Sequence, residues 1–280
     1  MAAVHKKSTD VVIGVIFTVF ALIWLMPLLG ILVNSFRPFT NAASTGWWKL
    51  LSERQVTMDN YQRMLSDAKF LRGFKNSVLI TLPTILLVMV VCSMTSYGLV
   101  FGKLKCAHKL YLLLCGLIVI PAEITLLPTL IILRTLGLAN TYPGIWMSHI
   151  ANIIPFGVFL IGSFMKSIPM DLIEAAEIDG CSVWRIFTRI IFPLSSSSVA
   201  SLAIFDFLWV WNDLLRSLVI IPNVKMQPLT AVLANSAGGY GEYVSVQAAG
   251  AILLLLPPLI VFLLFQKAFV NGVLQGAVKS

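Results

Sequence analysis

Charged side chains are scarce in this chain. Asp, Glu, Lys and Arg make up 11% of its 280 residues, against about 25% in an ordinary soluble domain. So few charges do not cover the surface of a water-soluble globule of this size, so a soluble enzyme is not expected. Intrinsic disorder is excluded more firmly, because it needs low hydrophobicity and 58% of these residues are hydrophobic. The mean hydropathy of +0.91 indicates lipid as the solvent.

Acidic residues are the scarcer kind of charge. The chain has 12 Asp and Glu against 20 Lys and Arg, which gives a net charge of +8. Such an excess is typical of proteins that bind nucleic acid or anionic membranes. Because the chain also has long apolar runs, we expect these cations to meet membrane lipid headgroups, and we expect no nucleic acid partner.

The residues of metal and nucleophile chemistry are few and scattered. The four cysteines form no CxxC pair and the three histidines form no HExxH motif, so no disulfide, metal site, cofactor or catalytic site is predicted. An intramembrane enzyme is therefore the weakest interpretation. A phosphate-binding GxxxxGK[ST] loop is also missing, so any ATP hydrolysis must come from another chain.

Six apolar runs are long enough to cross a membrane, since a transmembrane helix needs about 20 residues. They cover residues 11–36, 76–102, 110–133, 144–165, 194–215 and 244–266. The first run is longer than the apolar core of a signal peptide and is expected to be retained. In the third run Glu123 follows Pro121, where we expect the helix to break. The sequence thus predicts an all-α, polytopic integral membrane protein with about six transmembrane helices.

The connections between these runs are unequal in length and suggest three parts. Residues 1–75 hold the first transmembrane helix and a long external segment, residues 76–267 hold five helices, and residues 268–280 form a cytoplasmic tail. Lys and Arg are slightly denser in the segments that lie inside when the N-terminus is cytoplasmic. The charge bias therefore favours this topology only weakly.

One polar connection, residues 166–193, has the features of a docking helix. Ser167 and Pro169 are typical of a helix start and Gly180 of a helix end, which predicts a short helix of about three turns. Its acidic residues recur at positions 171, 174 and 177. A helix that lies on the bilayer usually carries Lys and Arg on its polar side. These acids therefore favour a protein partner over the lipid surface.

The same connection continues into a motif. Ser182 can cap a second helical segment over residues 183–192, which Pro193 is expected to end. Together the connection contains Glu174-Ala-Ala-x-x-x-Gly180 and then Ile190-x-Phe-Pro193. This pattern resembles the EAA loop of the membrane subunits of bacterial ABC importers. With Phe187 it is most similar to the permeases of carbohydrate importers, the MalG-like family.

Three further motifs resemble the same family. They are Leu136-Gly-Leu-Ala-Asn-Thr-Tyr-Pro-Gly144 between the third and fourth spans, Phe207-Leu-Trp-Val-Trp-Asn-Asp213 in the fifth, and Gln266-Lys-Ala-Phe-Val-Asn-Gly272 with Gly276-Ala-Val-Lys279 in the tail. Two positions depart from the family's pattern: Phe192 stands where Leu is usual, and Ser197 where a second Pro is common. Both affect how the loop re-enters the fifth span and leave the docking helix intact.

The resemblance implies a MetI-like ABC type I importer permease fold in the bacterial cell (inner) membrane, with both termini cytoplasmic. The implied partners are a second, MalF-like permease chain, two cytoplasmic ATPase subunits and an extracellular or periplasmic solute-binding protein. Residues 76–267 would form the permease core, and the solute would be a carbohydrate or a related polar molecule. The residues implied to couple the chain to the ATPases are Asp171, Glu174, Ala175, Ala176, Asp179 and Gly180.

Acidic residues within a span are candidates for function, because a charge in hydrocarbon is costly. Asp206 and Asp213 are seven positions apart on one side of the fifth span. One interpretation is a sugar-lining surface, because carboxylates accept hydrogen bonds from hydroxyls and Trp stacks on sugar rings. The candidate pathway residues are Asp206, Trp209, Trp211, Asn212 and Asp213. The other interpretation is that both acids lie near helix ends or hold neighbouring helices together; Glu123, His149 and Asn152 are interpreted as structural.

The last external connection carries Gly238, Gly239, Tyr240 and Gly241. It is similar to the family's loop that reaches into the binding protein, and a plain connecting loop is the equal alternative. For the whole chain, the main alternative is an ion-coupled secondary transporter with Asp206, Asp213 or Glu123 as proton sites. That alternative leaves the acidic loop helix unexplained, and no pair of broken helices in matching halves is evident.

Overall fold

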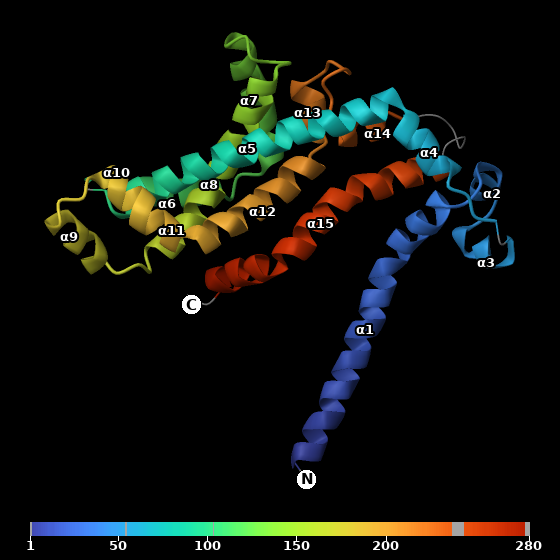
Figure 1. Cartoon of the computed structure of the whole chain (residues 1–280), viewed down its shortest axis with the longest axis horizontal. Coiled ribbons are helices and arrows are strands. Elements are labelled where there is room, and N and C mark those ends of the chain that lie inside the picture. Colours follow the sequence, from blue (N-terminus) through green and yellow to red (C-terminus); the bar gives the residue numbers. More distant parts are fainter. Residues whose placement is uncertain (1, 54, 103, 237–243, 278–280) are drawn as a thin grey trace. The chain divides into compact units, whose positions relative to one another are not determined.

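The computed structural model describes residues 2–53, 55–102, 104–236 and 244–277, and these residues form helices and connections without any strand (Figure 1). The predicted all-α class is confirmed. The chain divides into two compact units, Met1–Leu71 with Leu233–Leu255, and Arg72–Val232 with Leu256–Ser280. Two long helices, α5 (Ala68–Val100) and α15 (Val244–Ala277), contribute residues to both units.

Four helices are long and apolar enough to cross a membrane, and the number rises to six if each of two bent pairs counts as one span. The four are Val12–Ser35 within α1 (Ala2–Ser35), α5, α8 (Tyr142–Met165) and Val244–Gln266 within α15. The third predicted run is a pair bent by 108°, α6 (Ala107–Leu117) and α7 (Ala122–Thr135). Its predicted break is confirmed, with Pro121 as the residue before α7.

In the first unit, α1 keeps its apolar window unburied, as expected of a helix that faces lipid. The segment that follows, which is predicted to be external, is folded into short helices: α2 (Phe39–Ser44), η1 (Trp47–Lys49), α3 (Leu50–Glu53) and α4 (Asp59–Ser66). Its centre is Arg37, which is 0% exposed. The Arg37 guanidinium donates to the carbonyls of Asn41 at 3.0 Å and Thr45 at 3.1 Å, and to Asn34 Oδ1 at 3.1 Å. A buried cation thus closes the turn after α1.

In the second unit, α8 is the helix on which the others pack. It contacts α6, α7, α12 (Ser196–Asn212) and α13 (Leu215–Ile220). A close approach to α5 depends on Gly157, because a Cβ there would lie 2.6 Å from Cys92 Sγ. The core around this contact contains Val88, Cys92, Ile153, Val158, Ile161 and Leu202.

The loop predicted to dock to a partner folds as α9 (Asp171–Ile178), which is shorter than the three turns expected. The helix begins at Asp171 because the preceding residues finish α8 instead: the Ser167 hydroxyl donates to the Phe164 carbonyl at 2.6 Å. Gly180 has φ +75°, as predicted for a residue that ends a helix in the left-handed region.

The segment after α9 differs from its prediction at Pro193. Ser182 caps α10 (Val183–Ile186) as expected, and its hydroxyl accepts from the Arg185 N–H at 3.3 Å. The chain then continues through a π-helical turn, η2 (Phe187–Ile191), into α11 (Phe192–Leu194), so Pro193 does not end the helix. Proline is tolerated in a first helical turn, where its missing N–H is not needed. The bend of 73° comes before α12, after Leu194.

Candidate functional site

The short helix α9 presents an acidic and partly apolar surface. Its inner side is formed by Ile173 and Ala176, which are 2% and 6% exposed and belong to the core of the chain. The remaining predicted coupling residues, Asp171, Glu174, Ala175, Asp179 and Gly180, are exposed. Ile178 is 86% exposed. Leu172 and Met170 are also exposed, at 46% and 44%, so the surface of α9 combines several apolar side chains with its carboxylates.

Aromatic side chains hold the segment after α9 against α5. Phe187 lies at the centre, with its ring 5.2 Å from Tyr97, 5.7 Å from Trp184 and 5.9 Å from Phe192. The Tyr97 hydroxyl also donates to the Val183 carbonyl at 3.4 Å. The segment that follows the acidic helix is therefore packed against α5 rather than loosely tethered.

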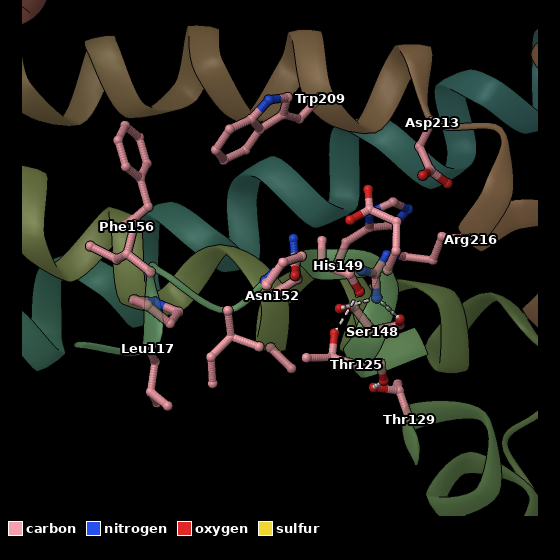
Figure 2. Close-up of a pocket in the computed structure, with 17 residues that line it drawn as sticks. Leu117, Thr125, Thr129, Ser148, His149, Asn152, Phe156, Trp209, Asp213 and Arg216 are labelled. Atoms are coloured by element: carbon pink, nitrogen blue, oxygen red, sulfur yellow. Dashed lines mark hydrogen bonds between the residues drawn. The ribbon is translucent and has the colours of Figure 1, made fainter. Parts of the chain in front are cut away.

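A second candidate site is a cavity of about 570 Å³ in the unit built on α8, which we call the polar pocket. It lies where the bend between α6 and α7 meets α8, α12 and α13. Figure 2 shows Trp209 and Phe156 toward one end and Asp213 and Arg216 toward the other. Between them lie Ser148, His149 and Asn152 of α8, and Glu123, Thr125 and Thr129 of α7 complete the polar lining.

The aromatic end of the polar pocket consists of two rings from different helices. Trp209 of α12 is 52% exposed, and its ring lies 5.5 Å from that of Phe156 on α8. The exposed side of the indole is a flat apolar surface next to polar groups. Such a surface accepts the apolar face of a sugar ring or another flat ligand.

The charged end of the polar pocket is organised around Arg216, which is 6% exposed. Its Nη1 donates to the carbonyl of Ser148 at 3.2 Å and to the hydroxyl of the same residue at 2.6 Å. Asp213 lies in the short connection between α12 and α13, and its Oδ2 accepts from the Ser217 N–H at 3.1 Å. Hydrogen bonds of this kind keep buried polar groups satisfied and their orientation fixed.

Two of the five residues predicted for a solute pathway, Trp209 and Asp213, line the polar pocket. The other three lie elsewhere. Asp206 is 1% exposed and buried among helices. Trp211 is 2% exposed, and its ring lies 5.7 Å from Phe74 and 5.5 Å from Phe207. Asn212 donates back to the Leu208 carbonyl of its own helix at 2.8 Å.

Several residues that line the polar pocket were not predicted to belong to the solute pathway. Glu123, His149 and Asn152 were interpreted as structural, with Glu123 a proton site in the alternative of an ion-coupled transporter. No role was predicted for Arg216. All four line the cavity. The available signal was the spacing of Asp213 and Arg216, three apart at the end of an apolar run. The predicted binding-protein loop Gly238–Gly241 lies outside the described residues.

A multi-pass membrane protein that has an internal polar pocket and an exposed acidic helix has the features of a membrane transport component. The chain belongs to the family described as binding-protein-dependent transport system inner membrane component, which matches residues 1–275. This confirms the predicted ABC importer permease. Members of the family are transport components rather than enzymes, and they work with an ATPase and a solute-binding protein.

Individual relatives cover nearly the whole chain. The osmoprotective compounds uptake permease protein GgtD of Synechocystis sp. is 38% identical over 93% of this chain and 89% of its own length. The arabinooligosaccharides transport system permease protein AraQ of Halalkalibacterium halodurans is 31% identical over 98% of this chain and all of its own. A bacterial ABC transporter that imports alginate has a similar fold, with a TM-score of 0.78 at 21% identity over 94% of this chain and 97% of that one.

Proposed function

We propose that this chain is a permease subunit that moves a carbohydrate or a closely related polyol into the cell, in a complex with a second permease, two cytoplasmic ATPase subunits and an external solute-binding protein. The observation that carries the proposal is the polar pocket. It combines an aromatic surface, Trp209 with Phe156, and hydrogen-bonding groups, Asn152 and Asp213, within one cavity. Sugars have both an apolar ring face and hydroxyls, so they use both ends.

The names of the relatives support a carbohydrate. AraQ of Halalkalibacterium halodurans, which matches 98% of this chain, belongs to an arabinooligosaccharide system. A cavity of about 570 Å³ has room for a small oligosaccharide unit, since ligand pockets of about 300–1,000 Å³ hold ligands of drug-like size. Uptake of an osmoprotective compound, named for another relative, is compatible with the same hydroxyl-binding chemistry.

The acidic helix α9 is proposed to dock to an ATPase subunit on the cytoplasmic side, with both termini of the chain on that side. Glu174 supplies a carboxylate for a basic partner, Ala175 allows close approach, and Ile178 inserts into an apolar recess of the partner. Ala176 holds α9 on its own core instead. Gly180 then turns the chain back toward the membrane. The glycine-rich loop at 238–241 is proposed to contact the binding protein.

The proposal is tested by expressing the chain with its neighbouring transport genes and purifying it under mild conditions. We expect an ATPase, a second permease and, in the presence of solute, a binding protein to be retained. In proteoliposomes, ATP hydrolysis should rise several-fold when the binding protein is added with a neutral oligosaccharide that it binds. Uptake driven by a proton gradient without ATP would contradict the proposal and favour an ion-coupled carrier.

A further inference from the structure

Two features of the polar pocket would ordinarily attract an anion. One is the Arg216 guanidinium, which belongs to α13 and lines the cavity. The other is the start of the 14-residue helix α7, which follows the bend of the third span at Pro121. The first N–H groups of a helix lack partners within the helix and carry partial positive charge. A pocket with only these features would bind carboxylates or phosphates.

This chain supplies carboxylates of its own to both features. Glu123 lies in the first turn of α7, and Asp213 lies three residues before Arg216. Burial lowers the pKa of Arg216, and the nearby Asp213 and Glu123 carboxylates oppose that lowering. Among the charged groups that line the polar pocket, two carboxylates therefore face one guanidinium.

The carboxylates of Asp213 and Glu123 differ in their hydrogen bonds and in their exposure. Asp213 Oδ2 accepts hydrogen bonds from the backbone N–H and the hydroxyl of Ser217, at 3.1 and 3.3 Å, so this carboxylate is tied to α13. Glu123 is exposed at the pocket surface. A solute that enters the polar pocket thus meets Glu123 as the exposed charge, since Arg216 is 6% exposed and its charge is balanced by the nearby Asp213.

We infer that Glu123 is a specificity-determining residue, which gives the polar pocket a negative potential and excludes anionic solutes such as uronates and sugar phosphates while neutral hydroxylated solutes pass. The inference rests on the proposed role of the pocket in solute passage. Like charges a few ångströms apart near a protein surface still repel, because the effective dielectric there is well below that of water. The same carboxylate still accepts hydrogen bonds from neutral hydroxyls.

The test measures the sign of the potential directly with small charged reagents. A cysteine is introduced at exposed Asn152 in the pocket, and the assembled complex in nanodiscs is treated with a cationic trimethylammonium-ethyl or an anionic sulfonato-ethyl methanethiosulfonate. Labelling of the parent chain's own cysteines is first subtracted from each rate. The rate with the cationic reagent is then divided by the rate with the anionic one, and this ratio is normalised to the same ratio for Thr40→Cys on α2. Thr129→Cys, also in the pocket lining, is a second reporter in case Asn152→Cys does not assemble.

We expect the normalised ratio to favour the cationic reagent by about tenfold, which is about 1.4 kcal/mol. Adding Glu123→Gln, which keeps the shape of the side chain, should bring the ratio to about one or reverse it. Asp59→Asn, an exposed acid of α4 in the other unit, should leave it unchanged. Equal rates in the parent, or a ratio that Glu123→Gln does not change, would overturn the inference. Because the reagents report without ATP or sugar, this outcome is independent of whether the complex imports carbohydrate.

Discussion

Replacing Trp211 by alanine should lower stability, whereas replacing Trp209 by alanine should change the response to solute, although the two residues are only two positions apart on α12. Trp211 is 2% exposed and packs against Phe74 and Phe207. Truncating a buried aromatic residue costs about 3–5 kcal/mol in soluble cores, and we expect about 3 kcal/mol here because helix association in lipid depends on packing without a hydrophobic term. That loss is roughly 150-fold in the folding equilibrium. Trp209 is 52% exposed, so its truncation should cost less than about 1 kcal/mol.

The two variants are compared by thermal inactivation of the purified complex and by solute-stimulated ATP hydrolysis. Trp211→Ala should lower the inactivation temperature by several degrees, whereas Trp209→Ala should keep it and raise the solute concentration needed for half-maximal stimulation about tenfold. Trp211→Phe and Trp209→Phe are the matched controls, which retain a ring at each site. Equal thermal losses for the two alanine variants, or normal solute dependence of Trp209→Ala, would refute the assignment of one residue to the core and the other to the pocket.

Three further predictions concern other parts of the chain. Glu174→Lys combined with Gly180→Pro should leave the protein in the membrane and allow ATP hydrolysis but stop uptake. The reason is that the docking charge is reversed and that proline cannot adopt the φ of +75° at Gly180. Normal uptake, measured in parallel with ATP hydrolysis, would contradict the coupling role. Arg37→Leu should make the segment after α1 about tenfold more sensitive to protease added to the chain in nanodiscs, because the backbone carbonyls that the guanidinium binds lose their donor. Unchanged cleavage would show that the segment folds without it. Gly157→Ala should lower the free energy of unfolding by about 1–3 kcal/mol, because the added methyl group meets Cys92. Adding Cys92→Ala should restore part of the loss. Additive effects of the two changes would argue against the contact.

The transmembrane part of the fold was predictable because lipid imposes a simple rule on sequence. Each span needs about 20 apolar residues, and the structure places helices on all six predicted runs. Gly180 was predictable for a local reason, since a left-handed residue after a helix favours glycine. The segment between α1 and α5 was not, because its helices are short and the carbonyls of Asn41 and Thr45 are bound by one buried residue, Arg37, that no periodic pattern marks.

The polar pocket was only half predictable. Helical spacing placed Asp206 and Asp213 on one side of the fifth span, but α12 ends at Asn212. Beyond that point the spacing rule no longer applies, so Asp206 stays in the core while Asp213 turns toward the cavity. Arg216 and Ser148 are 68 positions apart in sequence, and only the packing of α13 on α8 brings them together.

The segment that contains the bend before α12 connects the two candidate sites, the acidic helix α9 and the polar pocket, in sequence. The chain runs from α9 through the packed aromatic segment to Ser195, and then along α12 to the aromatic end of the pocket. Trp209 lies 14 residues beyond Ser195, or roughly 21 Å along a helix axis at 1.5 Å per residue. A tilt of about 10° at that bend would carry the indole by roughly 4 Å, on the scale of the spacing between packed rings. With α9 docked and a ring stacked on Trp209 as proposed, the length of α12 would convert a small angular change at the docking end into a displacement large enough to remove the stacking surface from that ring.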